Sequence, residues 1–240
     1  MENSLLNYMN KRFGDTSQKK NPGPHVAGPA ITISREVGCG GLKLAKELAT
    51  SLNKSVFCKK WQVISKEILQ HSAEELKLDT QKVNRLFTPT EHSTFDEILE
   101  AFNAKSYKSD RVILKTVREV IRGFAVDGCC IIVGRAGNVI GHDIDNSLHL
   151  RLVAPLDWRI EKIAAKHHVT LDEARHFIVE TERKRDTFRK YYMQKRDNQL
   201  YYDLVINVAK FKNDKIIELI LAAVELKGIL EKYKSSVSYF

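Results

Sequence analysis

The sequence predicts an α/β fold in which a parallel sheet is flanked by helices. Short β-branched runs alternate along the chain with longer segments whose apolar residues recur at helical spacing. Residues 129–133 are apolar throughout, which is typical of a strand buried on both faces of a parallel sheet. Nearer the N-terminus, a short apolar run leads through a glycine-rich loop into an amphipathic segment. A chain of 240 residues can hold one such domain with an insertion, or two small domains.

Each element can be placed from its local pattern. The expected strands cover residues 30–33, 129–133, 148–153 and 202–207. The expected helices cover residues 42–52, 110–126, 156–167 and 214–230, together with one that begins after Thr170. Thr170 is followed three residues later by Glu173, which is the pattern of a capping box. That helix can continue through the basic stretch that follows it.

The ends of the folded domain are set by composition. Residues 1–28 are predicted to be a flexible extension, because they end in the turn-rich sequence NPGPHVAGP. The domain is then expected over residues 29–240, with a polar, helical insertion at about 61–107. No apolar run reaches the ~18 residues of a membrane span, and the first twenty residues lack the apolar core of a secretory signal. We therefore expect a cytoplasmic protein with reduced cysteines and no membrane partner.

The formal net charge of +9 raises the question of a nucleic-acid partner. The basic residues are concentrated in residues 183–196, RKRDTFRKYYMQKR. Such a cluster suits a small phosphorylated ligand as well as a polynucleotide backbone, so the charge alone does not choose between them. The histidines and cysteines form no metal-ligand pattern, and no GxSxG or HExxH motif is present.

The glycine-rich loop is the first candidate for chemistry. Gly38, Gly40 and Gly41 lie between a strand and a helix, where backbone N–H groups and a helix N-terminus can surround a phosphate. The common nucleotide-binding loop is GxxxxGK[ST]. Aligned with it, this chain has Gly41 in place of the lysine and Leu42 in place of the hydroxyl residue. The alternative is a tight turn between strand and helix that binds no ligand.

Arg135 is the second candidate. It follows a predicted buried strand directly through Gly134, so its guanidinium should emerge at the carboxyl end of that strand. In open α/β sheets this edge is where ligands bind, and a planar guanidinium can hold a phosphate through two hydrogen bonds. The alternative is an arginine in a surface turn.

The basic cluster is the third candidate. On a helix, Arg185 and Arg189 share a face, with Glu182 and Asp186 at neighbouring spacings. Two arginines on a segment that closes over a substrate could stabilise the charge of a transferring phosphoryl group. The alternative is a solvated helix with ion pairs along its surface. Asp203 and Asn207, which flank the last strand, are expected to fix the chain locally.

Together these segments resemble the cytidylate kinase-like family of P-loop nucleoside monophosphate kinases. The resemblance rests on SREVGCGG, VGRAGNVI, RKRDTFRKYY and YYDLVIN, in that order over about residues 30–223. It implies a P-loop kinase core with a helical acceptor-binding insertion at about 61–107 and a basic lid at about 180–200. It also implies an acceptor phosphate near Arg135 and a catalytic role for Arg185 and Arg189. ATP with Mg²⁺ would bind at Ser34, Arg35, Gly38, Cys39, Gly40 and Gly41.

Three positions depart from the family pattern. Leu42 replaces an arginine after the double glycine, Cys58 replaces an aspartate, and Val37 replaces an aromatic residue. We expect an enzyme that transfers the γ-phosphoryl group of ATP to a nucleoside monophosphate, by resemblance CMP or dCMP. The departures leave two alternatives. One is a non-catalytic nucleotide- or nucleic-acid-binding member of the fold, and the other is a kinase for another small acceptor.

Overall fold

The structure is a computed structural model that describes residues 27–54, 60–65, 107–193 and 201–231. Contacts divide the chain into two units, each considered by itself. The first consists of residues 1–25 and 66–120, of which the structure describes only the N-terminal part of α6 (Tyr107–Asp127). The second consists of residues 26–65 and 121–240, and it contains the whole sheet. The predicted acceptor-binding insertion therefore lies almost entirely outside the described residues, as does Cys58.

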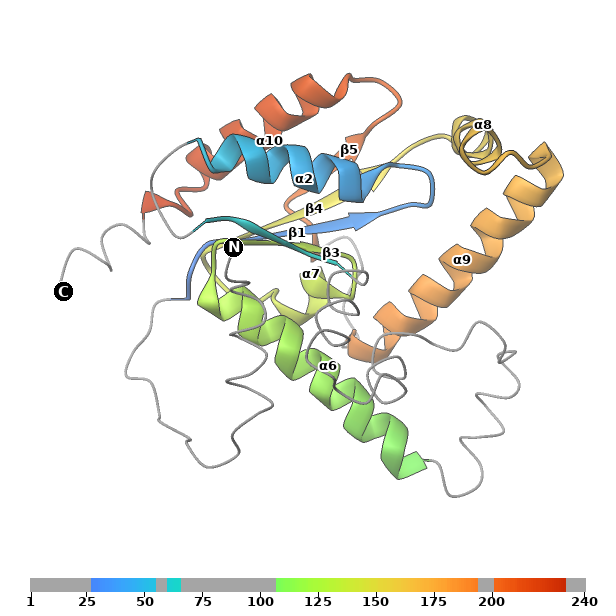
Figure 1. Cartoon of the computed structure of the whole chain (residues 1–240). Helices are drawn as coiled ribbons and strands as arrows, with labels where there is room; N and C mark the ends of the chain where they lie inside the picture. The colour runs from blue at the N-terminus through green and yellow to red at the C-terminus, as the bar shows by residue number, and fades with distance from the viewer. Residues whose placement is uncertain (1–26, 55–59, 66–106, 194–200, 232–240) are drawn as a thin grey trace. The chain divides into compact units, whose positions relative to one another are not determined.

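The sheet of the second unit has five parallel strands in the order β2-β3-β1-β4-β5 (Figure 1). The strands are β1 (Ala30–Arg35), β2 (Gln62–Ile64), β3 (Cys130–Val133), β4 (Ser147–Val153) and β5 (Leu204–Asn207). β1 is central and pairs with both β3 and β4. After β1 the chain forms β2 and β3 on one side of β1 within the sheet. After β3 it crosses over to form β4 and β5 on the other side of β1. The crevice at the carboxyl ends of such strands is the usual ligand site of an open α/β sheet.

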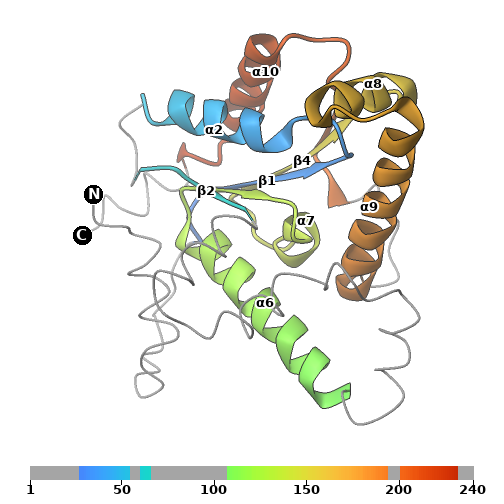
Figure 2. The same ribbon diagram turned by 45° about the vertical axis from the view of Figure 1, so that its right-hand side comes forward.

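Two helices cover one face of the sheet, α2 (Gly41–Leu52) and α10 (Asn213–Leu226) (Figures 1 and 2). Alternate residues of β1 and β4 point towards them, because successive side chains of a strand face opposite sides. This face and its helices form the main hydrophobic core, which includes Ile31, Ile33, Leu150, Leu152, Leu44, Leu48, Ile216 and Ile220. Burial of these side chains is the main stabilising contribution to the unit.

The opposite face carries α7 (Gly137–Ile140) and the end of α6 from Ile121 onwards. α7 lies directly on the sheet: a Cβ at Gly137 would be 2.9 Å from the Cγ2 of Ile132. Thr32, Ser34, His149 and Arg151 belong to this face, since they alternate with the core residues of β1 and β4. The face is thus more polar than the one covered by α2.

Helices α8 (Leu156–His167) and α9 (Leu171–Tyr192) follow β4. They lie near the carboxyl ends of β1 and β4, beyond the arrowheads in Figure 1. A small apolar cluster joins them to the loop after β1; it consists of Val37, Ile160, Ile163, Ala174 and Ile178. The capping box of Thr170 and Glu173 is present, and α9 runs through the basic cluster as far as Tyr192. Both features were predicted from the sequence.

Two elements differ from the sequence prediction. Gln62–Ile64 forms the outer strand β2, although the pattern from residue 61 indicates a polar helix. The four-residue helix α7 follows Arg135 where no helix is predicted. Both elements are too short to show a period in the sequence, and pairing with β3 or packing on β1 determines them.

The cysteines also differ in part from expectation. Cys39 and Cys130 are free and buried, as predicted. Cys129 is disulfide-bonded, so the prediction of a reduced thiol is wrong at this position. Spacing along the chain could not reveal it, because the fold and not the sequence brings two sulfur atoms together.

Candidate active site

The loop between β1 and α2 has the backbone shape of a phosphate-binding loop. Gly38 and Gly40 have positive φ angles of 93° and 66°, a region that L side chains rarely adopt. Gly40 is exposed and is the N-cap of α2, so no side chain covers the first turn of the helix at this position. Free N–H groups at such a helix start can hold an anion. Gly40 therefore lies where a phosphate could approach the backbone, and phosphate contacts of Gly38 and Gly41 stay a prediction.

Three N–H groups of the loop are already engaged within the protein. The Glu36 N–H donates to the Leu152 carbonyl at 3.0 Å. The Val37 N–H donates to Oε1 of Glu182 at 3.1 Å, and the Cys39 N–H donates to the Glu36 carbonyl at 3.3 Å. Burial and the Glu36 carboxylate raise the pKa of the Cys39 thiol to about 12, so this thiol stays protonated at neutral pH. Among the predicted phosphate contacts, Cys39 thus offers neither a thiolate nor a free amide.

Arg35 links the loop to the end of β3. Its side chain packs on Gly41, where a Cβ would lie 3.0 Å from Arg35 Cγ. Its Nη1 atom lies so close to Gly134 that a Cβ there would require the guanidinium to move. The guanidinium of Arg35 is therefore placed beside Gly134, the residue before Arg135, and brings a positive charge to a loop that lacks the usual lysine.

Helix α9 brings both predicted lid arginines to β1. Nη1 of Arg185 donates to the Arg35 carbonyl at 3.3 Å. Nη1 of Arg189 donates to the hydroxyl of Tyr202 at 3.2 Å, and this hydroxyl in turn donates to Oγ of Ser34 at 3.2 Å. The two arginines thus lie at the carboxyl end of the strand that leads into the glycine loop.

Arg135 lies in a strained segment next to α9. Gly134, Arg135 and Ala136 have φ angles of 75°, 54° and 52°, three consecutive residues in the left-handed region. Each non-glycine residue in this region costs about 1–2 kcal/mol, and such strain is frequent at functional sites. The Arg135 Cζ atom lies 5.7 Å from the centroid of the Phe188 ring. Arg135 and the predicted lid arginines therefore belong to one arrangement.

A partly buried ionic network, which the sequence does not predict, supports this arrangement. Arg159 of α8 is 6% exposed. Its Nη1 donates to Oε1 of Glu182 at 2.5 Å, and its Nε lies 3.4 Å from Oε2 of Glu36. The other oxygen of Glu36 lies 3.6 Å from Nη2 of Arg151. The network ties the glycine loop to α8 and α9, because Glu36 belongs to the loop and Glu182 to α9.

Sequence signals for these four residues exist but are weak. Arg151 interrupts the apolar strand LHLRLV, and Glu36 directly follows the SR of the loop motif. Arg159 and Glu182 each look like ordinary charged residues of amphipathic helices. Only the fold shows that they meet.

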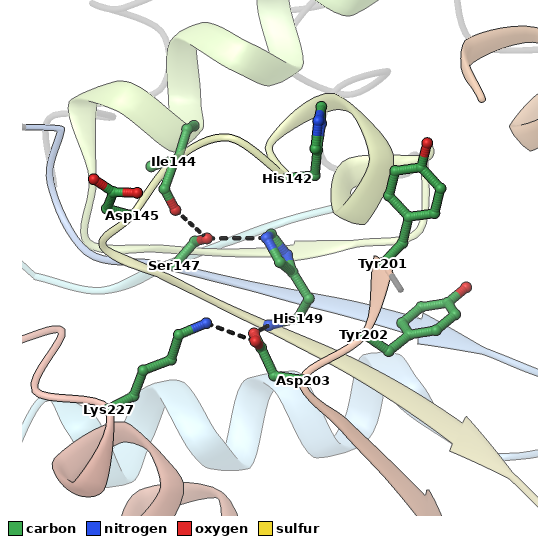
Figure 3. A pocket seen from close by; sticks show the side chains of 9 residues that line it. All are labelled: His142, Ile144, Asp145, Ser147, His149, Tyr201, Tyr202, Asp203 and Lys227. Carbon is green, nitrogen blue, oxygen red and sulfur yellow. Dashed lines mark hydrogen bonds and ion pairs between the residues drawn. The ribbon is translucent and has the colours of Figure 1, made fainter. Parts of the chain in front are cut away.

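A separate cavity of about 510 Å³ lies near the amino ends of β4 and β5 (Figure 3). His149 forms part of its wall: Nε2 is 2.9 Å from Ser147 Oγ, and Nδ1 is 2.8 Å from Thr32 Oγ1. Asp203 accepts a hydrogen bond from the His149 N–H at 2.7 Å and pairs with Lys227 at 2.7 Å. Because these polar groups bind one another, we assign them a structural role. The prediction that Asp203 fixes the chain locally is confirmed.

The chain matches a family and several proteins of known class. A parallel sheet whose central strand leads through a glycine loop into a helix, with arginines from a second helix beside it, defines a P-loop kinase core. The family model of the cytidylate kinase-like family matches residues 30–210, and the chain belongs to this family. It is 27% identical to the cytidylate kinase of Sulfolobus acidocaldarius over 202 residues, 83% of this chain and 96% of that protein.

Further comparisons agree with the fold. The cytidylate kinase of Haloarcula marismortui is 27% identical over 201 residues, 81% of this chain and 88% of that protein. An uncharacterized protein from Eubacterium ventriosum has a crystal structure with a TM-score of 0.56 and 20% identity, covering 82% of this chain and 98% of that one. Family membership and the two cytidylate kinases support kinase-type phosphoryl transfer. No helix in the described part of the chain is long and apolar enough to cross a membrane.

Proposed function

We propose that this protein transfers the γ-phosphoryl group of ATP to a nucleoside monophosphate, with CMP or dCMP as the acceptor. The observation that carries the proposal is the convergence of Arg185 and Arg189 on Ser34 and Arg35, immediately before the glycine loop. The names of the curated relatives favour cytidylate over other acceptors. Phosphoryl transfer requires positioning and charge neutralisation more than covalent chemistry by the protein, and arginines with backbone amides supply both.

In this proposal each part of the site has a separate role. The triphosphate of ATP lies against the loop from Gly38 to Gly41 and the start of α2. Arg135 binds the phosphate of the acceptor at the end of β3. Arg185 and Arg189 stabilise the negative charge that develops on the transferring group. Glu182 and Arg159 hold α9 on the loop, so that the arginines are in place before the reaction.

Mg²⁺ is expected to enter with ATP. The described residues contain no group of three or more His, Cys, Asp or Glu side chains that could hold a metal ion. Mg²⁺ in kinases is held mainly by phosphate oxygens and water with one or two protein ligands, so its binding with ATP does not require such a group. When bound, the ion would neutralise charge on the β- and γ-phosphates.

A second candidate is a non-catalytic nucleotide-binding protein. Leu42 favours it, because this residue stands where a P-loop has the hydroxyl that contacts Mg²⁺. The arginine arrangement favours the enzyme, since simple binding does not require charge stabilisation of a transferring group.

The deciding experiment is a coupled ADP-release assay of the full chain with ATP and each ribo- and deoxynucleoside monophosphate. We expect ADP release with CMP or dCMP and less with purine monophosphates. Release with a different acceptor would assign the protein to another substrate. ATP binding without ADP release from any acceptor would support the non-catalytic alternative.

A further inference from the structure

The hydroxyl oxygen of Tyr202 accepts hydrogen bonds from two arginines. Nη1 of Arg151 lies 3.3 Å and Nη1 of Arg189 lies 3.2 Å from the phenol oxygen. The Arg151 guanidinium also lies 5.5 Å from the centroid of the Tyr202 ring. The two guanidinium groups are therefore neighbours, although they come from β4 and α9.

Two adjacent cations repel each other, so their proximity needs an explanation. In the residues that the structure describes, each has one carboxylate partner: Asp186 is 2.5 Å from Arg189, and Glu36 is 3.6 Å from Arg151. The phenol oxygen accepts a hydrogen bond from each arginine and so holds both at one point. Nε of Arg189 is buried and has no hydrogen-bond partner among the described residues. Within the described part of the chain, the pair thus has one N–H donor without an acceptor.

The position of this pair indicates the kind of ligand. Ser34 and Arg151 lie on the polar face of the sheet, which also carries α7, while the glycine loop leads into α2 on the opposite face. Arg135, the proposed contact of the acceptor phosphate, lies two residues before α7. Two adjacent guanidinium groups suit a doubly charged phosphomonoester, which can accept hydrogen bonds from both.

We propose that Arg151 joins Arg189 in binding the phosphomonoester group of the acceptor, and that Tyr202 is the positioning residue that keeps these two arginines together. This inference rests on the proposed function. It adds Arg151 to the substrate contacts and gives Tyr202 a role that depends on its hydroxyl and not on its ring.

The ionisation of the Tyr202 phenol can show whether Arg151 and Arg189 bind an anion, without any catalytic turnover. Burial raises the pKa of Tyr202, but the Ser34 hydroxyl and the charges of Arg189 and Arg151 outweigh it, and the net pKa lies below its ordinary value. An anion bound by the same arginines should reduce this stabilisation of the phenolate. Inorganic phosphate should therefore raise the ionisation midpoint of Tyr202. The midpoint is obtained from phenolate absorbance as the difference between the full-length wild-type chain and Tyr202→Phe.

Kinetics test the positioning role. Tyr202→Phe keeps the ring and removes the hydroxyl, and we expect KM for the acceptor to rise about 10-fold while KM for ATP changes less than twofold. Arg151→Lys keeps the charge and loses the planar fork, and should show the same selective loss. Tyr201→Phe is the matched control, because Tyr201 is buried beside His142 and has no arginine contact among the described residues.

The outcomes separate this inference from the proposed function. A phosphate-dependent midpoint in the wild type and in Tyr201→Phe, with acceptor-selective losses in the other two variants, supports it. A midpoint that phosphate does not change overturns the subsite, even if the enzyme is active. Equal losses in Tyr201→Phe and Tyr202→Phe would also overturn it, because they would reflect packing. If no acceptor gives ADP, the proposed function fails, and the phosphate titration still decides whether the subsite exists.

Discussion

Arg185 Nη1 donates a hydrogen bond to the backbone carbonyl of Arg35 at 3.3 Å, across 150 positions of the sequence. The contact places the helix that carries the basic cluster against the residue that opens the glycine loop. A solvated basic helix would make no such contact. The structure thus brings together two segments that the sequence could only associate by resemblance.

The lid arginines can be tested by substitution. Arg185→Ala should lower kcat by about 10²-fold or more and raise KM less, because Arg185 is proposed to bind charge that develops during transfer. Arg189→Ala should lower kcat by a similar factor and also raise KM for the acceptor, because Arg189 is proposed to contact the acceptor phosphate as well. Lysine should fail at one or both positions, since it lacks the planar fork. Arg175→Ala is the control, because Arg175 is exposed on the first turns of the same helix and pairs only loosely with Asp157 at 3.7 Å.

Full activity with lysine at both positions would contradict the catalytic role and would show that the basic cluster is a solvated surface. Losses confined to polynucleotide binding, with a flatter salt dependence, would point to a nucleic-acid partner.

Arg135 should discriminate between the two substrates. Arg135→Ala should weaken binding of the monophosphate by at least 10-fold, since one charge-assisted hydrogen bond contributes about 1.5–3 kcal/mol. Binding of ATP should change far less. Calorimetric titration of each nucleotide into the variant measures both affinities. A change of less than twofold for the monophosphate, or an equal loss for both nucleotides, would count against the assignment.

Gly40 allows the loop to be tested with a matched control elsewhere. Gly40 and Gly228 have φ angles of 66° and 65°, and a Cβ at either would meet no atom closer than 3.8 Å. Alanine at either position should therefore lower the free energy of unfolding by a similar amount, about 1–2 kcal/mol. Only Gly40→Ala should weaken ATP binding, because only this Cβ lies where the phosphates would approach. Valine at Gly40 should abolish ATP binding. If Gly40→Ala binds ATP like Gly228→Ala, the loop does not hold the phosphates.

The lowered pKa of the buried His149 predicts that the free energy of unfolding depends on pH. Burial lowers the pKa of His149 to about 4, against the attraction of Asp203, while Lys227 lowers it further. Its hydrogen bonds assign the tautomer: Ser147 donates to the Ile144 carbonyl at 2.5 Å and so accepts from Nε2–H, which leaves Nδ1 of the neutral imidazole to accept from the Thr32 hydroxyl. Because the unfolded chain binds the proton more readily, the contribution of the neutral His149 to the free energy of unfolding is complete above about pH 6.5. This contribution is lost as the pH falls towards 4.

The loss should amount to about 3 kcal/mol between these pH values, and chemical denaturation at a series of pH values measures it. His149→Gln should remove most of this pH dependence. Ser147→Ala provides the control, since it removes a hydrogen bond without removing the titrating group. It should lower the free energy of unfolding while leaving the slope against pH nearly unchanged. An identical slope in the wild type and in His149→Gln would contradict the assignment.

Most of the sheet and its helices could be predicted from the sequence, because their patterns are long or clear. Residues 156–167 form α8 as predicted, and the capping box at Thr170 marks the start of α9. Longer strands such as β4 are recognisable by their apolar residues. β2 could not be predicted, because three residues at the outer side of the sheet depend on pairing with β3 and not on local preference.

The site was predictable only in part. The glycine loop, Arg135 and the lid arginines stand in recognisable motifs. Arg151 and Arg159 do not, and Tyr202 stands in YYDLVIN without any sign of its partners, because the roles of all three depend on contacts with residues far away in the sequence. Nothing in LHLRLV shows that its arginine meets a tyrosine 51 positions later. Such residues become visible only when the strands are aligned in the sheet.

The packing of Arg35 against Gly41 and Gly134 has a consequence for how these positions tolerate change. A side chain at residue 134 would occupy the space of the Arg35 guanidinium, so the two positions should be epistatic. Gly134→Ala should destabilise the chain more in the presence of Arg35 than in an Arg35→Ala background, and a double-mutant cycle of unfolding free energies measures the difference. The φ of 75° at Gly134 should leave a residual loss in both backgrounds. A substitution at one of these positions is therefore expected to require an accommodating substitution at the other. Residues 35 and 134 should change together in evolution and not independently.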